Sequence, residues 1–180
     1  MRTTYNPFPD PAHADESGLL CIGGALDVDT LYAAYSHGIF PWPHEGTPLL
    51  WFTPAARGVL DFDDLHVSRS FKRFMRHTRW HLTFDQQFAA VIRACAVVPR
   101  PGQMGTWITD DMFDAYGQLH QLGFAHSVEA WQGGELVGGL YGVGLGTLFS
   151  GESMFARAPD ASKVAFVWLV RQLHAWDFEL

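Results

Sequence analysis

The sequence has few of the features that define disulfide-rich, membrane-spanning or secreted proteins. Two cysteines among 180 residues, Cys21 and Cys95, cannot form a disulfide framework or a zinc knuckle. No apolar run reaches the ~18 residues of a membrane span. The N-terminal residues also lack the apolar segment of a secretory signal. We therefore expect no membrane partner and a reduced, cytoplasmic setting.

Charged side chains are also scarce, at 17% of residues against a typical ~25%. By contrast, 48% of the residues are hydrophobic and 14% are aromatic. This composition excludes a disordered chain and, at this length, predicts one domain or two small ones with a buried core. The net charge of −7 argues against a general nucleic-acid-binding protein.

The charges are unevenly distributed along the chain. Residues 1–64 hold nine acidic and two basic residues, whereas residues 65–180 hold ten of each. Five of the basic residues lie between His66 and Arg79, a stretch without an acidic residue. Such an asymmetry indicates two parts with different partners, and we place the boundary after residue 64.

Residues 1–64 contain seven of the ten prolines and predict one clear helix. Asp27 or Asp29 can accept hydrogen bonds from the first turn of that helix, and Gly38 lies where a left-handed C-cap belongs. Two prolines flank Trp42 and remove backbone freedom on both sides. We therefore expect Trp42 on a stiff, extended turn.

The rest of the chain alternates between helical and strand-like patterns. From Ala125 the apolar period changes to that of a strand, and Gln132-Gly133-Gly134 is a hairpin signal. We expect an α+β protein whose later part is an antiparallel meander with a helix on its face. The predicted helices cover 68–77, 86–96, 110–122 and 162–176, and the predicted strands 49–54, 80–84, 125–131, 135–143 and 147–150.

Four basic residues fall on one face of the helix predicted at 68–77. Arg69, Lys72, Arg73 and Arg76 have the spacing i, i+3, i+4 and i+7. Such a face can be an ordinary solvated surface. The lack of neighbouring acids favours contact with phosphates instead, which would give a slope near ~−4 in log K against log [salt].

Other candidate side chains have two interpretations each. Trp42, Trp51 and Trp107 lie near Pro or Gly, and each could anchor a turn or stack on a base for ~1–3 kcal/mol. Glu152 follows an apolar strand and could be a solvated loop residue or a functional carboxylate.

Three patterns resemble sites but fail on context. The glycines of Gly142–Gly146 precede a strand-like segment, whereas a dinucleotide fingerprint needs a helix there. The segment around Ser153 resembles a nucleophile elbow but lacks the final glycine of that motif. His77 and His81 have metal-ligand spacing only on a continuous helix, which the strand expected at 80–84 interrupts. We expect no metal site.

Eight segments, taken in order, closely resemble leucyl/phenylalanyl-tRNA–protein transferases. No single segment is decisive, but the ordered set from about Phe8 to Leu180 is specific. The segments are 18–26 (GLLCIGGAL), 35–42 (YSHGIFPW), 50–54 (LWFTP), 66–70 (HVSRS), 105–109 (GTWIT), 125–129 (AHSVE), 136–142 (LVGGLYG) and 146–155 (GTLFSGESMF).

The resemblance implies an enzyme that moves Leu, Phe or Met from aminoacyl-tRNA to the N-terminal Arg or Lys of an acceptor protein, marking that protein for degradation. It implies no cofactor. It also implies a small N-terminal domain, residues 1–64, before an acetyltransferase-like (GNAT-type) domain, residues 65–180.

The resemblance also implies three groups of site residues. Glu152 would lie at the substrate site as the candidate catalytic residue and would attract the cationic acceptor. The terminal adenosine would contact Trp42, Trp107, Tyr35 and Tyr116; the aminoacyl side chain would contact Leu140, Gly151, Glu152 and Met154; and the tRNA backbone would contact Arg69, Lys72, Arg73 and Arg76.

The sequence departs from the family pattern at its end. Family members continue with an Ile-Asp-Cys-Gln segment, whose Asp and Gln are the proposed proton-handling pair, and no counterpart precedes Leu180. We therefore expect the second domain to lack its last elements. We also expect lower stability, more self-association and weaker transfer than in a complete homologue.

Two alternative functions stay open. A non-catalytic aminoacyl-tRNA-binding remnant would keep the aromatic and basic groups without the chemistry. An acyl-coenzyme A N-acetyltransferase would need a pyrophosphate-binding loop, which residues 150–163 do not contain.

Overall fold

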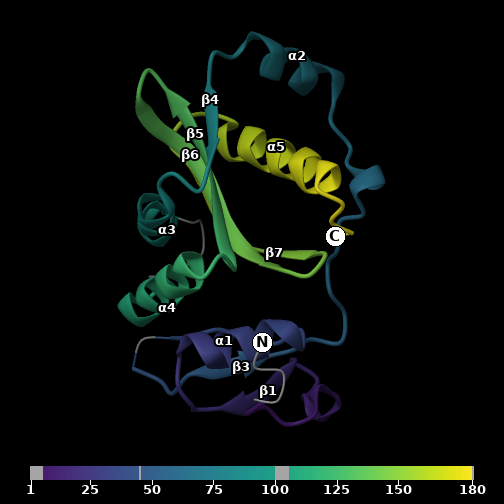
Figure 1. The fold of residues 1–180 in the computed structure, drawn as a ribbon, viewed down its shortest axis with the longest axis vertical. Coiled ribbons are helices and arrows are strands. Elements are labelled where there is room, and N and C mark those ends of the chain that lie inside the picture. Colours follow the sequence, from purple (N-terminus) through teal and green to yellow (C-terminus); the bar gives the residue numbers. More distant parts are fainter. Residues whose placement is uncertain (1–5, 45, 100–105, 180) are drawn as a thin grey trace. The chain divides into compact units, whose positions relative to one another are not determined.

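The computed structural model describes residues 6–44, 46–99 and 106–179. It shows a protein of mixed helices and antiparallel strands, which confirms the α+β prediction (Figure 1). No described helix has the length and apolar character needed to cross a membrane. In chain order the elements are η1 (Pro11–His13), β1 (Leu19–Ile22), α1 (Val28–Ser36), β2 (Phe40–Pro41), β3 (Leu50–Phe52), η2 (Phe62–Asp64), α2 (Arg69–His77), β4 (His81–Phe84), α3 (Phe88–Val97), α4 (Asp110–Gln121), β5 (Ala125–Gln132), β6 (Glu135–Leu145), β7 (Leu148–Ala156) and α5 (Ala161–Ala175).

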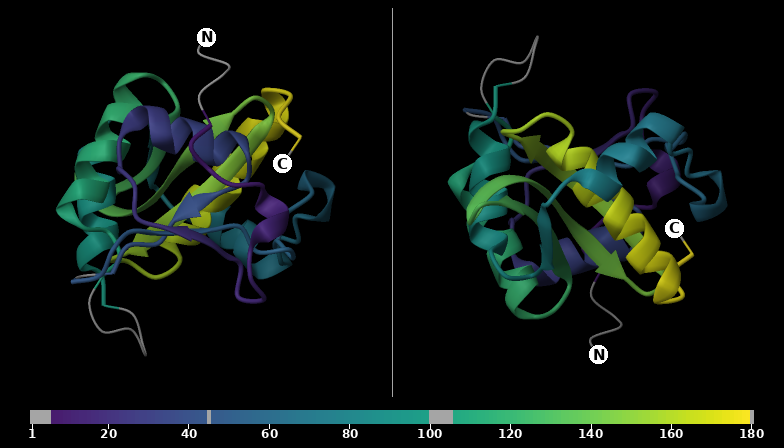
Figure 2. Two further views of the ribbon diagram at one scale, coloured as in Figure 1. Left: turned by 90° about the horizontal axis from the view of Figure 1, so that it is seen from below. Right: turned by 90° about the horizontal axis from the view of Figure 1, so that it is seen from above.

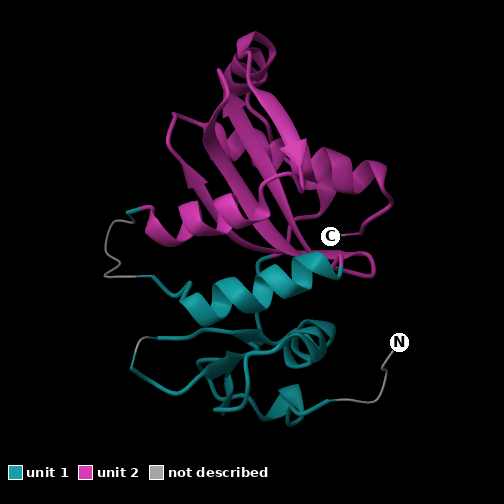
Figure 3. Ribbon diagram, turned by 60° about the vertical axis from the view of Figure 1, so that its left-hand side comes forward, with its two compact units in different colours: residues 1–58, 99–122 teal, residues 59–98, 123–180 magenta. Residues whose placement is uncertain are grey.

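The chain forms two compact units (Figure 3). Unit 1 comprises residues 1–58 and 99–122, and unit 2 comprises residues 59–98 and 123–180. The predicted division into 1–64 and 65–180 differs from this one, because α4 packs against α1 and so belongs with the N-terminal residues. The amphipathic pattern of α4 shows that one side is buried, but not against which partner.

Unit 1 contains a small antiparallel sheet in the order β1-β3-β2. Phe40 pairs with Phe52, and Pro41 pairs with Trp51. Because successive strand residues point to opposite faces, the two phenylalanines share one face and Trp51 lies on the other. Trp51 is 1% exposed and its indole N–H donates to the Gly23 carbonyl at 2.9 Å. Trp51 is therefore a core anchor.

The helix predicted in residues 1–64 is α1. Asp27 caps it, since its carboxylate accepts a hydrogen bond from the Thr30 N–H at 2.8 Å. Gly38 follows the helix with φ +69°, a left-handed conformation that glycine adopts without strain. Of the two aspartates that the sequence offered, Asp27 is the capping residue, and the prediction for Gly38 is confirmed. Strand β1 was not predicted, because LLCI shows no alternation between apolar and polar residues.

Unit 2 is built around the antiparallel sheet β4-β5-β6-β7, which confirms the predicted meander. Helix α5 covers one face and α3 covers the other (Figures 1 and 2). Two neighbouring glycines of β6 show this: a Cβ at Gly138 would meet Ala161 of α5, whereas a Cβ at Gly139 would meet Val91 of α3. Strand β7 is longer than the predicted 147–150.

The close approach of β6 to α5 gives a test of the packing. A Cβ at Gly138 would lie 2.5 Å from the Ala161 Cβ and 2.9 Å from its carbonyl carbon. We expect Gly138→Ala to reduce the free energy of unfolding by about 1–3 kcal/mol, because backbone would have to move. Gly117 in α4 has no neighbour within 4 Å of an added Cβ, so we expect Gly117→Ala to stabilise by up to about 1 kcal/mol. Urea denaturation followed by circular dichroism measures both. Equal effects of the two substitutions would contradict this packing.

Candidate functional site

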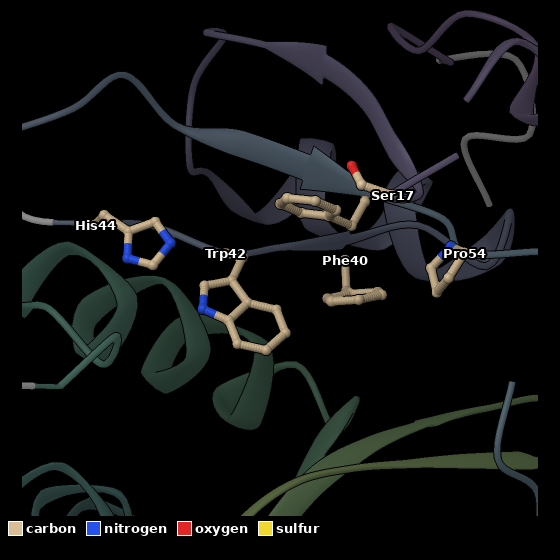
Figure 4. A pocket seen from close by; sticks show the side chains of 6 residues that line it. Ser17, Phe40, Trp42, His44 and Pro54 are labelled. Carbon is tan, nitrogen blue, oxygen red and sulfur yellow. The ribbon is translucent and has the colours of Figure 1, made fainter. Parts of the chain in front are cut away.

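An aromatic pocket lies on the sheet of unit 1 (Figure 4). The rings of Phe40, Trp42 and Phe52 form a triangle in which each pair of ring centroids is 6.2 Å apart. The pocket has a volume of about 340 Å³, and Ser17, His44 and Pro54 complete its lining. Trp42 is 45% exposed. An indole with this exposure beside two phenyl rings can stack on a planar ligand.

The local sequence explains the position of these rings. Phe40 and Trp42 are two residues apart, so they project from the same side of an extended segment. Pro41 and Pro43 are buried and fix the backbone between and after them. Trp42 thus lies on a backbone segment restrained by two prolines, as the sequence predicted, and the structure shows that its side chain is exposed.

A short loop places Ser17 beside the pocket. Asp15 accepts hydrogen bonds from the Ser17 hydroxyl at 2.6 Å, the Ser17 N–H at 2.8 Å and the Leu19 N–H at 3.0 Å. These bonds, above all the one from the Ser17 hydroxyl, lower the pKa of Asp15. Because they favour the ionised carboxylate, the loop is held by an acceptor that stays charged at neutral pH.

The other residues predicted around the adenosine also belong to unit 1. Tyr35 of α1 and Tyr116 of α4 share a hydrogen bond between their hydroxyl groups, and their rings meet edge to face at 6.3 Å. Trp107 is half-buried immediately before α4. The structure brings the two tyrosines together and keeps Trp107 on the segment that leads to one of them. Gly105, in the same predicted motif, lies outside the described residues.

The residues predicted around the aminoacyl side chain lie on β6 and β7 of unit 2. Leu140 and Met154 are directly opposite each other in the strand pairing. Leu140 is 3% exposed, in the core under α5, whereas Met154 is 44% exposed. Gly151 and Glu152 lie where the pairing shifts register, and Glu152 is half-buried. Bulges of this kind re-aim side chains and are common beside active sites.

The predicted basic helix is α2 of unit 2. Ser68 caps it by accepting a hydrogen bond from the Phe71 N–H at 3.2 Å. No residue of α2 is buried, and all four predicted cations are exposed. Phe71 and Phe74 stack at 5.9 Å. A second pocket of about 470 Å³ separates these rings from Asp160 and Lys163 at the start of α5.

Two polar groups of unit 2 were not predicted from the sequence. Glu129 is fully buried and accepts hydrogen bonds from the Thr83 and Ser127 hydroxyls and from the Gln87 N–H. His126 contacts Asp85 through its Nδ1 at 2.7 Å. The sequence feature that could have indicated Glu129 is its position as a glutamate in the middle of an apolar strand. In the part of the chain that the structure describes, no three His, Cys, Asp or Glu side chains are grouped to hold a metal ion.

Comparison with known proteins gives consistent similarities. The family described as leucyl/phenylalanyl-tRNA protein transferase matches residues 59–180, and its N-terminal domain matches residues 24–55. A leucyl/phenylalanyl-tRNA–protein transferase of Myxococcus xanthus is 56% identical over 173 residues, covering 96% of this chain and 74% of that protein. The protein of the same name from Stutzerimonas stutzeri is 57% identical over 175 residues, covering 96% and 77%. The one from Hahella chejuensis is 52% identical over 174 residues, covering 97% and 74%.

Proposed function

Because the chain belongs to the leucyl/phenylalanyl-tRNA–protein transferase family, we propose that it transfers Leu, Phe or Met from aminoacyl-tRNA to the N-terminal Arg or Lys of an acceptor protein. The acceptor would thereby be marked for degradation. Since charged tRNA is made and used in the cytoplasm, we propose that location as well. The exposed Trp42 in an aromatic pocket is the observation that best supports this function.

The proposed reaction needs no external energy source, because the aminoacyl ester is already activated. The acceptor α-amine attacks the ester carbonyl and a peptide bond forms. The bond to the tRNA 3′ oxygen breaks, and the proton lost by the amine balances the one gained by that oxygen. Positioning of the two substrates supplies much of the rate in such a reaction. The protein's main task is therefore to hold the tRNA end and the amine at attack distance.

In unit 1 we propose that the aromatic pocket takes the 3′-terminal adenosine. Trp42 would stack on the base, and Trp107 would contact the same nucleoside. Stacking of a base on an indole is worth about 1–3 kcal/mol. Tyr35 and Tyr116 would support this arrangement by fixing α1 to α4 through their shared hydrogen bond.

In unit 2 we propose that the end of the sheet takes the aminoacyl side chain and the acceptor. Met154 would contact the apolar side chain, with Leu140 as the buried residue beneath it. Gly151 would leave space, and the carboxylate of Glu152 would attract the cationic acceptor. Apolar pockets distinguish substrates by only about 1–3 kcal/mol per methylene group, which fits a range of Leu, Phe and Met donors.

We also propose that unit 2 has an acetyltransferase-like architecture. In its favour are the antiparallel order β4-β5-β6-β7 and the helices α3 and α5 on opposite faces. In this proposal the bulge at Glu152 opens the sheet for substrate, and no coenzyme takes part.

A transfer assay tests the proposed function. The purified chain is incubated with tRNA that carries labelled Phe and with a peptide beginning with Arg. We expect label in this peptide above the enzyme-free control, and none in the same peptide with an acetylated N-terminus. Binding of charged tRNA without any transfer would favour the binding-only alternative. Failure to bind charged tRNA would contradict both.

The basic helix gives a second test of tRNA binding. We propose that Arg69, Lys72, Arg73 and Arg76 contact the acceptor-stem phosphates. Each lost contact with a duplex should reduce the slope of log K against log [salt] by about 0.9. Arg73→Gln should therefore weaken binding of a labelled acceptor-stem hairpin and flatten this slope by about that amount, as measured by fluorescence anisotropy. Arg171→Gln, an exposed change on α5, is the matched control. Equal slopes for both variants would exclude Arg73 from the interface.

A further inference from the structure

Arg57 lies against the aromatic pocket of unit 1. Its guanidinium carbon is 4.8 Å from the centre of the Phe40 ring, and one of its terminal N–H groups donates to the carbonyl of Gly38. The side chain is exposed. Two separate contacts thus hold an exposed cation beside a ring that lines the pocket.

The ring under the guanidinium belongs to the aromatic cluster of the pocket. Phe40 also stacks on Phe52, with ring centroids 6.2 Å apart and an interplanar angle of 28°. Arg57 therefore lies against a ring that itself lines the pocket together with Trp42 and Phe52.

The charge of unit 1 makes this cation unusual. The described residues of unit 1 include eight Asp or Glu. Among the residues of unit 1 that the structure describes, Arg57 is the one Lys or Arg. The tRNA end carries a phosphate at each nucleotide, and an acidic surface repels it. The one Lys or Arg in the described part of this unit thus lies at the aromatic pocket.

We propose that Arg57 binds the phosphodiester that joins the terminal adenosine of the tRNA to the preceding nucleotide. This proposal rests on the proposed function, in which the aromatic pocket takes the terminal nucleoside. One N–H of the guanidinium is used by Gly38, and a planar guanidinium has five N–H donors, so several are left for phosphate oxygens. Arg57 would be a positioning residue: it fixes the nucleotide whose 3′ end carries the ester and does not touch the reacting atoms.

A purely structural role would use the same contacts. In that case Arg57 would only tie the Gly38 carbonyl to Phe40 and hold the pocket in shape. The two roles differ in the ligands they affect, because a phosphate contact matters only for a ligand that carries a phosphate. A change in pocket shape affects a nucleoside and its nucleotide alike.

Binding of adenosine and adenosine 5′-monophosphate to the whole chain separates these roles. We expect Arg57→Gln to weaken binding of the monophosphate about fivefold to tenfold, because hydrogen bonds to charged groups are stronger than those between neutral groups. The affinity for adenosine should stay within twofold of the parent value. Arg57→Lys keeps the charge without the planar guanidinium, so its affinity for the monophosphate should lie between those of the parent and of Arg57→Gln. For the trinucleotide CpCpA, Arg57→Gln should flatten the salt slope by about 0.7, the value for one contact on a single strand.

Each other outcome has a definite meaning. Equal weakening of adenosine and its monophosphate, or no weakening of either, would overturn the proposal for Arg57. Suppose that Trp42→Ala loses adenosine binding, whereas all Arg57 variants bind the nucleoside with the same affinity. The proposed function would then stand without the proposal for Arg57. If the parent chain binds neither ligand, the proposed use of the pocket fails, and the proposal fails with it. Arg171→Gln and melting curves control for charge and folding.

Discussion

Replacing Glu129 by alanine is expected to unfold most of unit 2 near physiological temperature. Its side chain is 0% exposed and accepts hydrogen bonds from Thr83, Ser127 and the backbone of Gln87. Each buried donor left without an acceptor costs about 1–3 kcal/mol. Two of these donors, the Thr83 and Ser127 hydroxyls, are buried. Their loss, with the cavity that is left, amounts to several kcal/mol against a typical total stability of about 5–15 kcal/mol. A drop of more than about 10 °C in the melting temperature is the expected result.

Two further variants make this prediction specific. Glu129→Gln keeps the shape of the side chain and one carbonyl oxygen but places an NH₂ group among donors, so an intermediate loss is expected. Glu135→Ala changes an exposed glutamate at the start of β6 and should leave the melting temperature nearly unchanged. If Glu129→Ala melts within a degree or two of the parent protein, the buried network is not what joins β4, β5 and the start of α3.

The second large effect concerns binding of the tRNA end. Trp42→Ala removes the exposed indole of the aromatic pocket, and we expect it to weaken binding of a labelled CCA-ended acceptor hairpin by roughly 5- to 150-fold. Trp42→Phe keeps an aromatic face and should recover part of this loss. Because the indole is uncharged, the slope of log K against log [salt] should stay at the parent value. Fluorescence anisotropy over a range of salt concentrations measures both quantities.

The chain offers a control matched by exposure. Trp176 is 46% exposed, against 45% for Trp42, but it belongs to unit 2 and packs on Phe84. Trp176→Ala is expected to bind the hairpin as the parent does. Equal losses in the two tryptophan variants would indicate a general loss of folded protein. An unchanged affinity in Trp42→Ala would remove the aromatic pocket from the binding site.

Local elements were predictable where the signal lies within a few residues. The caps at Asp27 and Thr109 accept hydrogen bonds from their own first turns, as expected from side chains that compete for free N–H groups. Ser68, which was predicted as the first residue of its helix, also caps it. The hairpin at Gly133 and Gly134 has positive φ at both positions, which glycine favours. The stiffness of Trp42 between two prolines is likewise a local property.

The candidate site was predictable in part, and through two different kinds of signal. The basic face of α2 follows from spacing alone, because residues three and four apart share a helix face. The roles expected of Trp42, Tyr116 and Glu152 came from resemblance to a family. Local context alone left Trp42 and Glu152 with two interpretations each and did not single out Tyr116. Arg57 was not singled out, since one arginine in a loop is unremarkable until the ring beneath it is known.

By itself the sequence determined the helices α1 to α5, the strands β3 to β7 with the meander of unit 2, and the family to which the chain belongs. Only the tertiary structure decided that α4 belongs to unit 1, that Trp51 is a core anchor while Trp42 is exposed, and that Glu129 is buried with three donors. The physical reason is the range of the interactions. Caps, turns and helix faces depend on neighbours within about four residues, whereas burial and long-range hydrogen bonds depend on which distant segments pack together.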